Sequence, residues 1–213
     1  MTDLKKYPLG DSCMCWSLGQ SIDPDTSRTI LRAYRRLKII LNGKAGVRDL
    51  VPSYTALALH FDPLQADVSD LSETIERVFH EKQGAAEHVD VQNENIREIK
   101  FEVSYTGQDL ENVATLHGLT VAEVIRLHKQ PCYTVAMIGF IPHFPYLTGL
   151  DPRLETPRLA HPRKKVAAGS VAIGGAQAGI YPSDSPGGWN IIGHTDPGPL
   201  KDLVPGDRVM FYQ

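Results

Sequence analysis

The chain has 213 residues, which is enough for one large domain or two small ones. Its hydrophobic content of 42% and its charged content of 22% are ordinary for a soluble globular protein. The net charge is -3 and neither Lys nor Arg runs in blocks, so the charge gives no support to nucleic-acid binding or to a membrane-surface role. No apolar run approaches the roughly 20 residues that cross a bilayer, and the N-terminus lacks an apolar signal core, so we expect a cytoplasmic protein.

The first half of the chain is predicted to contain six elements. Their order is strand, helix, strand, strand, helix, strand, over about residues 7–17, 24–41, 47–51, 55–61, 69–82 and 99–105. Asp25 or Ser21 caps the first helix, Pro24 suits its first turn, and Asn42-Gly43 ends it. This order is typical of a ferredoxin-like, split βαβ domain.

A polar, weakly patterned stretch near residues 85–95 indicates a domain boundary. We therefore divide the chain into an α/β domain over residues 1–90 and a second domain over residues 91–213. The fold class is α+β.

The second half is predicted to be mostly β-structure. Its one clear helix begins at the capping box formed by Thr120 and Glu123. A strand over 133–140 follows, and short strands separated by Gly and Pro are predicted around 166 and over 169–173, 179–181, 189–192 and 207–212. This pattern indicates a β-barrel or a sandwich.

The cysteines do not indicate a metal site. Cys13 and Cys15 are two residues apart, so in a strand both side chains lie on one face. Zinc is one interpretation, but two cysteines of this spacing do not complete a site. Two small buried hydrophobic residues are the better interpretation, and we predict no metal.

Residues 139–195 carry most of the chemistry that the sequence offers, because they combine Gly and Pro with aromatic and basic residues. Arg158 and Arg163 each follow a proline, which suits a clamp for a carboxylate or phosphate. The alternative is that they are loop arginines paired with nearby acids. Phe140, Phe144 and Tyr146 lie on a proline-stiffened loop, and they either fill the core or form the wall of a pocket.

A second loop contains Tyr181, Ser185 and the pair Gly187-Gly188. Backbone amides of a Gly-Gly turn donate well to an anion or a carbonyl oxygen. The alternative is a tight turn that delivers Trp189 to the core, and the two interpretations are compatible. Ser170 does not lie in a nucleophile elbow, so its hydroxyl is expected to satisfy turn backbone.

Three histidines are candidates for acid–base chemistry, because imidazole titrates near neutral pH. They are His128, His143 and His194. A structural role is the alternative for each, and His128 also lies at a helix end, where a cation is favourable.

These loop motifs resemble one known family. The segments GFIPHFPYL, AAGSVAIGG and IYPSDSPGGWNIIGHT, together with the two Pro-Arg units, are similar to the KipI / allophanate hydrolase subunit 1 family. The early YPLGDS and GVRDLVPSYTALALHFDP segments also fit its N-terminal half. The resemblance covers nearly the whole chain, and it implies an α/β domain followed by a cyclophilin-like β-barrel.

The resemblance also implies a reaction and partners. Bacterial members include the B subunit of 5-oxoprolinase, which acts with a homologous C subunit and a separate A subunit to hydrolyse 5-oxoproline to glutamate at the expense of ATP. Related domains form the carboxyltransferase part of urea carboxylase, and one member inhibits a sporulation histidine kinase. No cofactor is expected on this chain, since ATP would be used by the complex.

We accordingly assign two sets of residues for a small amide or lactam substrate. The catalytic candidates that would move a proton are His128 and His143. The substrate-binding candidates are Phe140, Phe144, Tyr146, Arg158, Arg163, Ser170, Tyr181, Ser185, Gly187, Gly188, Trp189 and His194.

The sequence departs from the family pattern at three positions. His143 stands where the family usually has Gly, His194 where it has Arg, and Ala167 where a Pro is expected. His143 adds bulk and a titratable group, and His194 replaces a permanent cation with a pH-dependent one. These changes put the identity of the substrate in doubt more than the fold.

Overall fold

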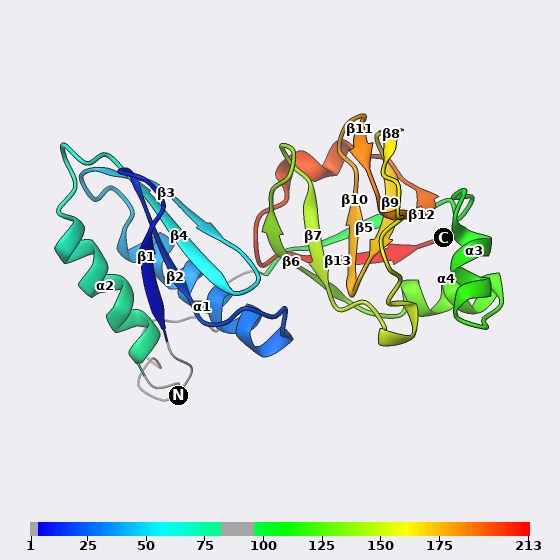
Figure 1. Cartoon of the computed structure of the whole chain (residues 1–213), viewed down its shortest axis with the longest axis horizontal. Coiled ribbons are helices and arrows are strands. Elements are labelled where there is room, and N and C mark those ends of the chain that lie inside the picture. The colour runs from blue at the N-terminus through cyan, green and yellow to red at the C-terminus, as the bar shows by residue number, and fades with distance from the viewer. Residues whose placement is uncertain (1–3, 82–95) are drawn as a thin grey trace. The chain divides into compact units, whose positions relative to one another are not determined.

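The computed structural model of the chain describes residues 4–81 and 96–213, and it divides into two compact units, Met1–Asn95 and Ile96–Gln213 (Figure 1). The domain boundary predicted near residues 85–95 lies outside the described residues, as does the last residue of the predicted helix 69–82. Among the described residues, no helix is both long and apolar enough to cross a membrane.

The first unit is a four-stranded antiparallel sheet with two helices. The strands follow the order β1-β2-β4-β3. The elements are β1 (Lys5–Pro8), β2 (Cys13–Ser17), α1 (Pro24–Ile40), β3 (Val47–Pro52), β4 (Ala56–Phe61) and α2 (Val68–His80). Leu57, Leu59 and Phe61 alternate along β4 and contribute to a core that both helices share, so the helices pack on one face of the sheet.

Local signals set the helix ends in this unit. Asp23 caps α1 by accepting a hydrogen bond from the backbone N–H of Thr26 at 2.7 Å, so the prediction of Asp25 or Ser21 as the cap is wrong. Asp25 instead lies in the first turn of the helix, where a negative charge is favourable. Asp67 caps α2 in the same way as Asp23 caps α1.

The sixth element of the predicted ferredoxin-like domain belongs elsewhere. The predicted strand 99–105 forms β5 (Glu98–Glu102), which pairs in parallel with β13 (Arg208–Tyr212) in the sheet of the second unit. The edge beside β2 is occupied by β1, whose Tyr7 lies opposite Cys15. Alternation predicted a strand at 99–105, but alternation does not identify the partner of a strand.

The second unit is a curled seven-stranded sheet with the order β12-β9-β10-β7-β6-β13-β5. Besides β5 and β13, its strands are β6 (Tyr133–Ile138), β7 (Pro145–Thr148), β9 (Ser170–Gly174), β10 (Gln177–Ile180) and β12 (Asn190–His194). A separate hairpin pairs β8 (Arg163–Val166) with β11 (Ser185–Gly187), and Figure 1 shows these two strands side by side. A mixed α/β fold with a curled sheet is thus confirmed, whereas the cyclophilin-like type of barrel stays a prediction.

The two edges of the curled sheet meet at one backbone bridge. Ser104, just beyond β5, exchanges two hydrogen bonds of 2.9 Å with His194 at the end of β12. Further along, the N–H groups of Gly107 and Asp109 donate to the carbonyls of Ile192 and Ile191. We call this line of contacts the seam.

Helices α3 (Leu110–Leu116) and α4 (Val121–Lys129) lie next to each other in this unit (Figure 1). The predicted capping box of α4 is confirmed, because the Thr120 hydroxyl accepts from the N–H of Glu123 while the Glu123 carboxylate accepts from the N–H of Thr120. Helix α3 and strand β7 were not predicted. Each is short, and β7 begins at a proline.

The two faces of the curled sheet bury different clusters. Val171 and Ile173 of β9 contribute to the main core, whereas Ala172 between them contributes to a second cluster. Because side chains alternate along a strand, the second cluster lies on the opposite face of the sheet. That second cluster contains four of the predicted site residues, namely Phe144, Tyr146, Tyr181 and Trp189.

Candidate functional site

The second cluster is built around four aromatic rings. Phe144 contacts Tyr146, Tyr181 and Trp189 with ring centroids 4.9, 5.1 and 5.5 Å apart, and Tyr146 lies 5.7 Å from Trp189. All four pairs meet edge to face, which is the favourable arrangement for aromatic quadrupoles. Phe144, Tyr181 and Trp189 are buried and Tyr146 is half-buried, so the rings fill a core and Tyr146 reaches its rim.

Glycines on the strands leave room for these rings. A Cβ at Gly174 would lie 2.6 Å from the Trp189 ring, and a Cβ at Gly187 would lie 2.2 Å from the Tyr181 hydroxyl. Real side chains do not tolerate such distances, so both positions require glycine. Packing therefore explains Gly187. The carbonyl of Gly188 accepts a hydrogen bond of 2.7 Å from the N–H of Leu159, and an anion-binding role of the two glycine amides stays a prediction.

The two Pro-Arg units have different environments. Arg163 donates to the Asp109 carboxylate at 2.6 Å and to the Trp189 carbonyl at 3.3 Å. Asp109 is buried, and its second carboxylate oxygen accepts from the backbone N–H of Ile191 at 2.7 Å. Arg163 thus follows the alternative interpretation, an arginine paired with a nearby acid, and it ties β8 to the start of β12.

Arg158 is the arginine that remains available. Its guanidinium lies 5.6 Å from the centre of the Trp189 ring, a cation–π contact, and the residue is exposed. Among residues 4–81 and 96–213, no carboxylate pairs with it. Burial raises the pKa values of Tyr146 and Tyr181 while the positive charge of Arg158 opposes that rise, so both hydroxyls stay protonated at neutral pH.

The loop between β6 and β7 has an unusual backbone. Phe140 and His143 have φ angles of 66° and 68°, in the left-handed region that favours glycine. Phe140 is 60% exposed and packs its ring edge to face on Phe144, at 5.7 Å. His143 is exposed on the same loop. A glycine at position 143, which the family resemblance leads us to expect, would adopt this φ angle without strain, and the strain of two such residues marks this loop as a functional candidate.

Replacing His143 by glycine is expected to make the second unit about 1 kcal/mol more stable than replacing it by alanine. The reason is that alanine keeps the steric cost of a positive φ, whereas glycine removes it. Urea unfolding of both variants, followed by Trp189 fluorescence in a Trp16→Phe background, measures the difference. Equal midpoints for the two variants would mean that the loop relaxes out of the left-handed conformation.

Three further candidates lie apart from Arg158 or are buried. Ser170 is buried in β9 opposite His194, and His194 is exposed at the far end of β12 from Trp189. Ser185 is buried in β11, and its hydroxyl has no hydrogen-bond partner among the described residues. The aromatic site therefore comprises Phe144, Tyr146, Tyr181, Trp189 and Arg158, with Phe140 and His143 on the adjoining loop.

His128 does not lie at this site. It is fully buried in the main core, where its ring stacks on Phe211 at 4.5 Å and its Nδ1 is 2.8 Å from the hydroxyl of Tyr105. Burial lowers the pKa of His128 to about 3. The structure thus gives it no access to a ligand at the aromatic cluster, and its observed role is to fill the core.

Acidification is expected to destabilise the second unit through His128. The unfolded chain binds a proton near the ordinary pKa of 6.5, whereas the folded chain does not bind it until about pH 3, so the free energy of unfolding falls as pH drops between these values. The expected loss is about 2 kcal/mol between pH 7 and pH 5. Urea unfolding at both pH values should show this loss in the wild-type chain and a clearly smaller one in His128→Phe. The same loss in both would assign it to other groups.

Asp109 was missed by the sequence interpretation. It binds Arg163 across 54 residues of sequence and also the backbone of Ile191. A single acid before a short helix carries no pattern that points to such a contact, so no sequence signal identifies it.

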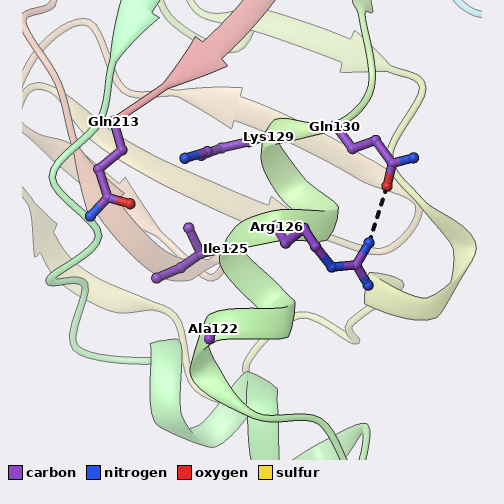
Figure 2. Close-up of a pocket in the computed structure, with 6 residues that line it drawn as sticks. All are labelled: Ala122, Ile125, Arg126, Lys129, Gln130 and Gln213. Atoms are coloured by element: carbon purple, nitrogen blue, oxygen red, sulfur yellow. Dashed lines mark hydrogen bonds between the residues drawn. The ribbon is translucent and has the colours of Figure 1, made fainter.

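Two other features carry no predicted site residue. A shallow pocket of about 610 Å³ lies beside α4 (Figure 2). Ile125 and Lys129 extend to the side where Gln213 lies, and the Arg126 guanidinium donates to the side-chain oxygen of Gln130 at 3.4 Å. Cys13 and Cys15 are buried in β2. Within the described part of the chain, no group of three or more His, Cys, Asp or Glu side chains is placed to hold a metal ion.

Comparison with known proteins assigns the chain to a family. The family of the carboxyltransferase domain, subdomain C and D, matches residues 4–198. The chain belongs to this family. Two curated relatives, each named as the B subunit of 5-oxoprolinase, support the match. The protein of Escherichia coli O157:H7 is 34% identical, over 96% of this chain and 94% of its own length, and that of Haemophilus influenzae is 56% identical, over 46% of this chain and 48% of its own length. The resemblance of the loop motifs is thereby confirmed.

A solved structure shows the same fold within a longer chain. The crystal structure of TTHA0988 is 33% identical and has a TM-score of 0.78, with 94% of this chain and 39% of that chain covered. The present chain thus spans about half the length of the Haemophilus influenzae relative in their alignment and well under half of TTHA0988. Members of the carboxyltransferase subdomain C and D family therefore occur both as chains of this size and as parts of larger chains.

Proposed function

We propose that this chain is the B subunit of an ATP-dependent 5-oxoprolinase, acting with a homologous C subunit and a separate A subunit. The observation that carries the proposal is the similarity to the 5-oxoprolinase B subunit of Escherichia coli over nearly the whole of both chains. The sequence has no nucleotide-binding motif, so ATP is assigned to another component of the complex.

The aromatic site suits one half of a composite substrate site. The substrate 5-oxoproline is a small lactam that carries a carboxylate. Arg158, which has no carboxylate partner among the described residues, offers its guanidinium for that carboxylate, and this group lies 5.6 Å from the centre of the Trp189 ring. Tyr146 is half-buried beside Trp189 and its hydroxyl is protonated at neutral pH, so we include it in the wall of the substrate site. His143 on the adjoining loop is the remaining candidate for proton transfer, and the homologous partner would complete the site.

Glutamate release tests the proposal. The chain is mixed with the A and C subunits encoded in its own genome, 5-oxoproline and ATP, and the mixture is compared with one that lacks this chain. Release that requires both ATP and this chain supports the assignment. A complex that assembles without releasing glutamate would contradict it.

Carboxyl transfer is the second candidate. The matching family is named for the carboxyltransferase domain, and a putative urea carboxylase of Emericella nidulans is 33% identical over 45% of this chain. The same assembled complex, given urea and carboxybiotin labelled in its carboxyl group, distinguishes the two candidates, because only a carboxyltransferase moves the label to urea and releases free biotin. Inhibition of a histidine kinase stays a third prediction, and absence of an effect on kinase autophosphorylation at micromolar concentration would count against it.

A further inference from the structure

The loop over residues 156–159 is bonded to the residues that surround the start of β12. The carbonyl of Pro157 accepts a hydrogen bond of 2.9 Å from the side-chain amide of Asn190. Two residues further along the loop, the N–H of Leu159 donates to the carbonyl of Gly188 at 2.7 Å. The loop is thus held at two points that lie one residue apart on each side.

These two hydrogen bonds bring Arg158 to Trp189. Arg158 lies between the two bonded residues of the loop, and Trp189 lies between their two partners. The guanidinium accordingly lies 5.6 Å from the centre of the indole ring. An arginine side chain has many rotamers, so a lasting contact with the ring needs a backbone that is fixed in place.

The side chain of Asn190 serves the loop because its backbone is already used in the sheet. Asn190 is paired with Ile173 of β9 at the start of β12, and it is buried. Its Nδ2 donates to the Pro157 carbonyl and, at 3.4 Å, to the Ile173 carbonyl, so both N–H groups of the amide have acceptors. These two carbonyl acceptors also fix the orientation of the amide, since its oxygen could bond to neither of them.

A third attachment keeps the loop in place when the amide is removed. Thr156 and Gly175 exchange backbone hydrogen bonds of 2.7 and 3.3 Å. Without the amide of Asn190 the loop therefore stays attached at Thr156 and at Leu159, while the carbonyl of Pro157 between them loses its hydrogen bond. We expect a local shift of the backbone that carries the guanidinium and no loss of the fold.

We propose that Asn190 is a positioning residue, which holds Arg158 against Trp189 for the carboxylate of the substrate. The identity of that carboxylate rests on the proposed function, whereas the attachment of the loop is a property of this chain. A guanidinium that is fixed before the substrate arrives loses less conformational entropy on binding. Removal of the amide should therefore raise KM more than it lowers kcat.

Steady-state kinetics of the assembled complex test the proposal with Asn190→Ala and with Asn190→Leu, which keeps the branched shape of the side chain and removes its donors. We expect each variant to raise KM for 5-oxoproline about fivefold, as for one neutral hydrogen bond, and to change kcat by less than about twofold. In an Arg158→Ala background neither should raise KM further, since Asn190 acts through Arg158. The matched control is Tyr133→Phe, which removes a buried hydrogen bond of 2.9 Å to the carbonyl of His128 in the main core and should leave KM unchanged.

The emission of Trp189 in the chain alone, in a Trp16→Phe background, tests the attachment without substrate. Arg158→Ala should shift this emission, and the shift should be about half as large or smaller when Asn190→Ala is already present. The full shift in both backgrounds, an unchanged KM in both Asn190 variants, or an equal rise of KM in Tyr133→Phe would each overturn the proposal. A wild-type complex that releases no glutamate contradicts the proposed function instead, and the emission measurement then decides whether Asn190 holds Arg158.

Discussion

Replacing Arg158 by alanine is expected to lower kcat/KM of the assembled enzyme for 5-oxoproline by about 10- to 100-fold, mainly by raising KM. A hydrogen bond to a charged group contributes about 1.5–3 kcal/mol, which corresponds to this range. Arg158 is exposed, lies 5.6 Å from the centre of the Trp189 ring and has no carboxylate partner among the described residues, so under the proposed function we assign the substrate carboxylate to it.

Two companion variants sharpen this expectation. Arg158→Lys keeps the charge but loses the planar stacking and the two-pronged hydrogen bonding, so its effect should fall between those of wild type and alanine. Arg153→Ala is the control, because Arg153 is an exposed arginine that already pairs with Asp151 at 2.7 Å. Steady-state kinetics of the three assembled complexes provide the measurement. If Arg158→Ala retains the activity of Arg153→Ala, the aromatic site does not bind the substrate carboxylate.

The sequence predicted contacts between residues close together in the chain, but not contacts between residues far apart in it. The capping box of Thr120 and Glu123 is a contact between residues three apart, and it was predicted correctly. The strand at 99–105 was also found, but its partner β13 lies more than 100 residues away, and nothing in a pattern of alternation identifies such a partner. For that reason the predicted split βαβ domain wrongly included this strand, which belongs to the sheet of the second unit.

The site was predictable in its aromatic part only. Aromatic rings on a proline-stiffened loop are expected either in a core or in a pocket wall. The rings of Tyr146 and Trp189 both contact the ring of Phe144. Ion pairs between residues far apart in the sequence could not be predicted in this way, because the sequence does not show which of several acidic residues pairs with Arg163. His128 shows the same limit, because a histidine at a helix end looks alike in sequence whether it faces solvent or the core.

Replacing Asp109 by alanine is expected to lower the free energy of unfolding of the second unit by about 3 kcal/mol. The substitution leaves the buried N–H of Ile191 without its acceptor and the Arg163 guanidinium without its counter-ion. Removing one partner of a buried ion pair costs about 3–5 kcal/mol, and the lower end applies because a quarter of the Arg163 side chain is exposed. Urea unfolding followed by Trp189 fluorescence, in a Trp16→Phe background, measures the change.

The matched variants separate the two contacts of Asp109. Arg163→Ala keeps the hydrogen bond from Ile191 to Asp109 but leaves that buried carboxylate without its counter-ion, so it should cost about as much as Asp109→Ala. The double variant should cost less than the sum of the two, since both remove the same ion pair. Asp184→Ala is the control, because its pair with Lys165 is largely exposed, and it should cost much less than Asp109→Ala.

The Trp189 emission of the folded Asp109→Ala variant tests whether Asp109 also positions the aromatic site. Arg163 also donates to the carbonyl of Trp189, so losing the Asp109–Arg163 pair should shift the position of that ring and its emission before unfolding begins. A stability loss without an emission shift would limit Asp109 to a structural role. A shift together with a raised KM for 5-oxoproline would show that this buried carboxylate positions the aromatic site on which Arg158 rests.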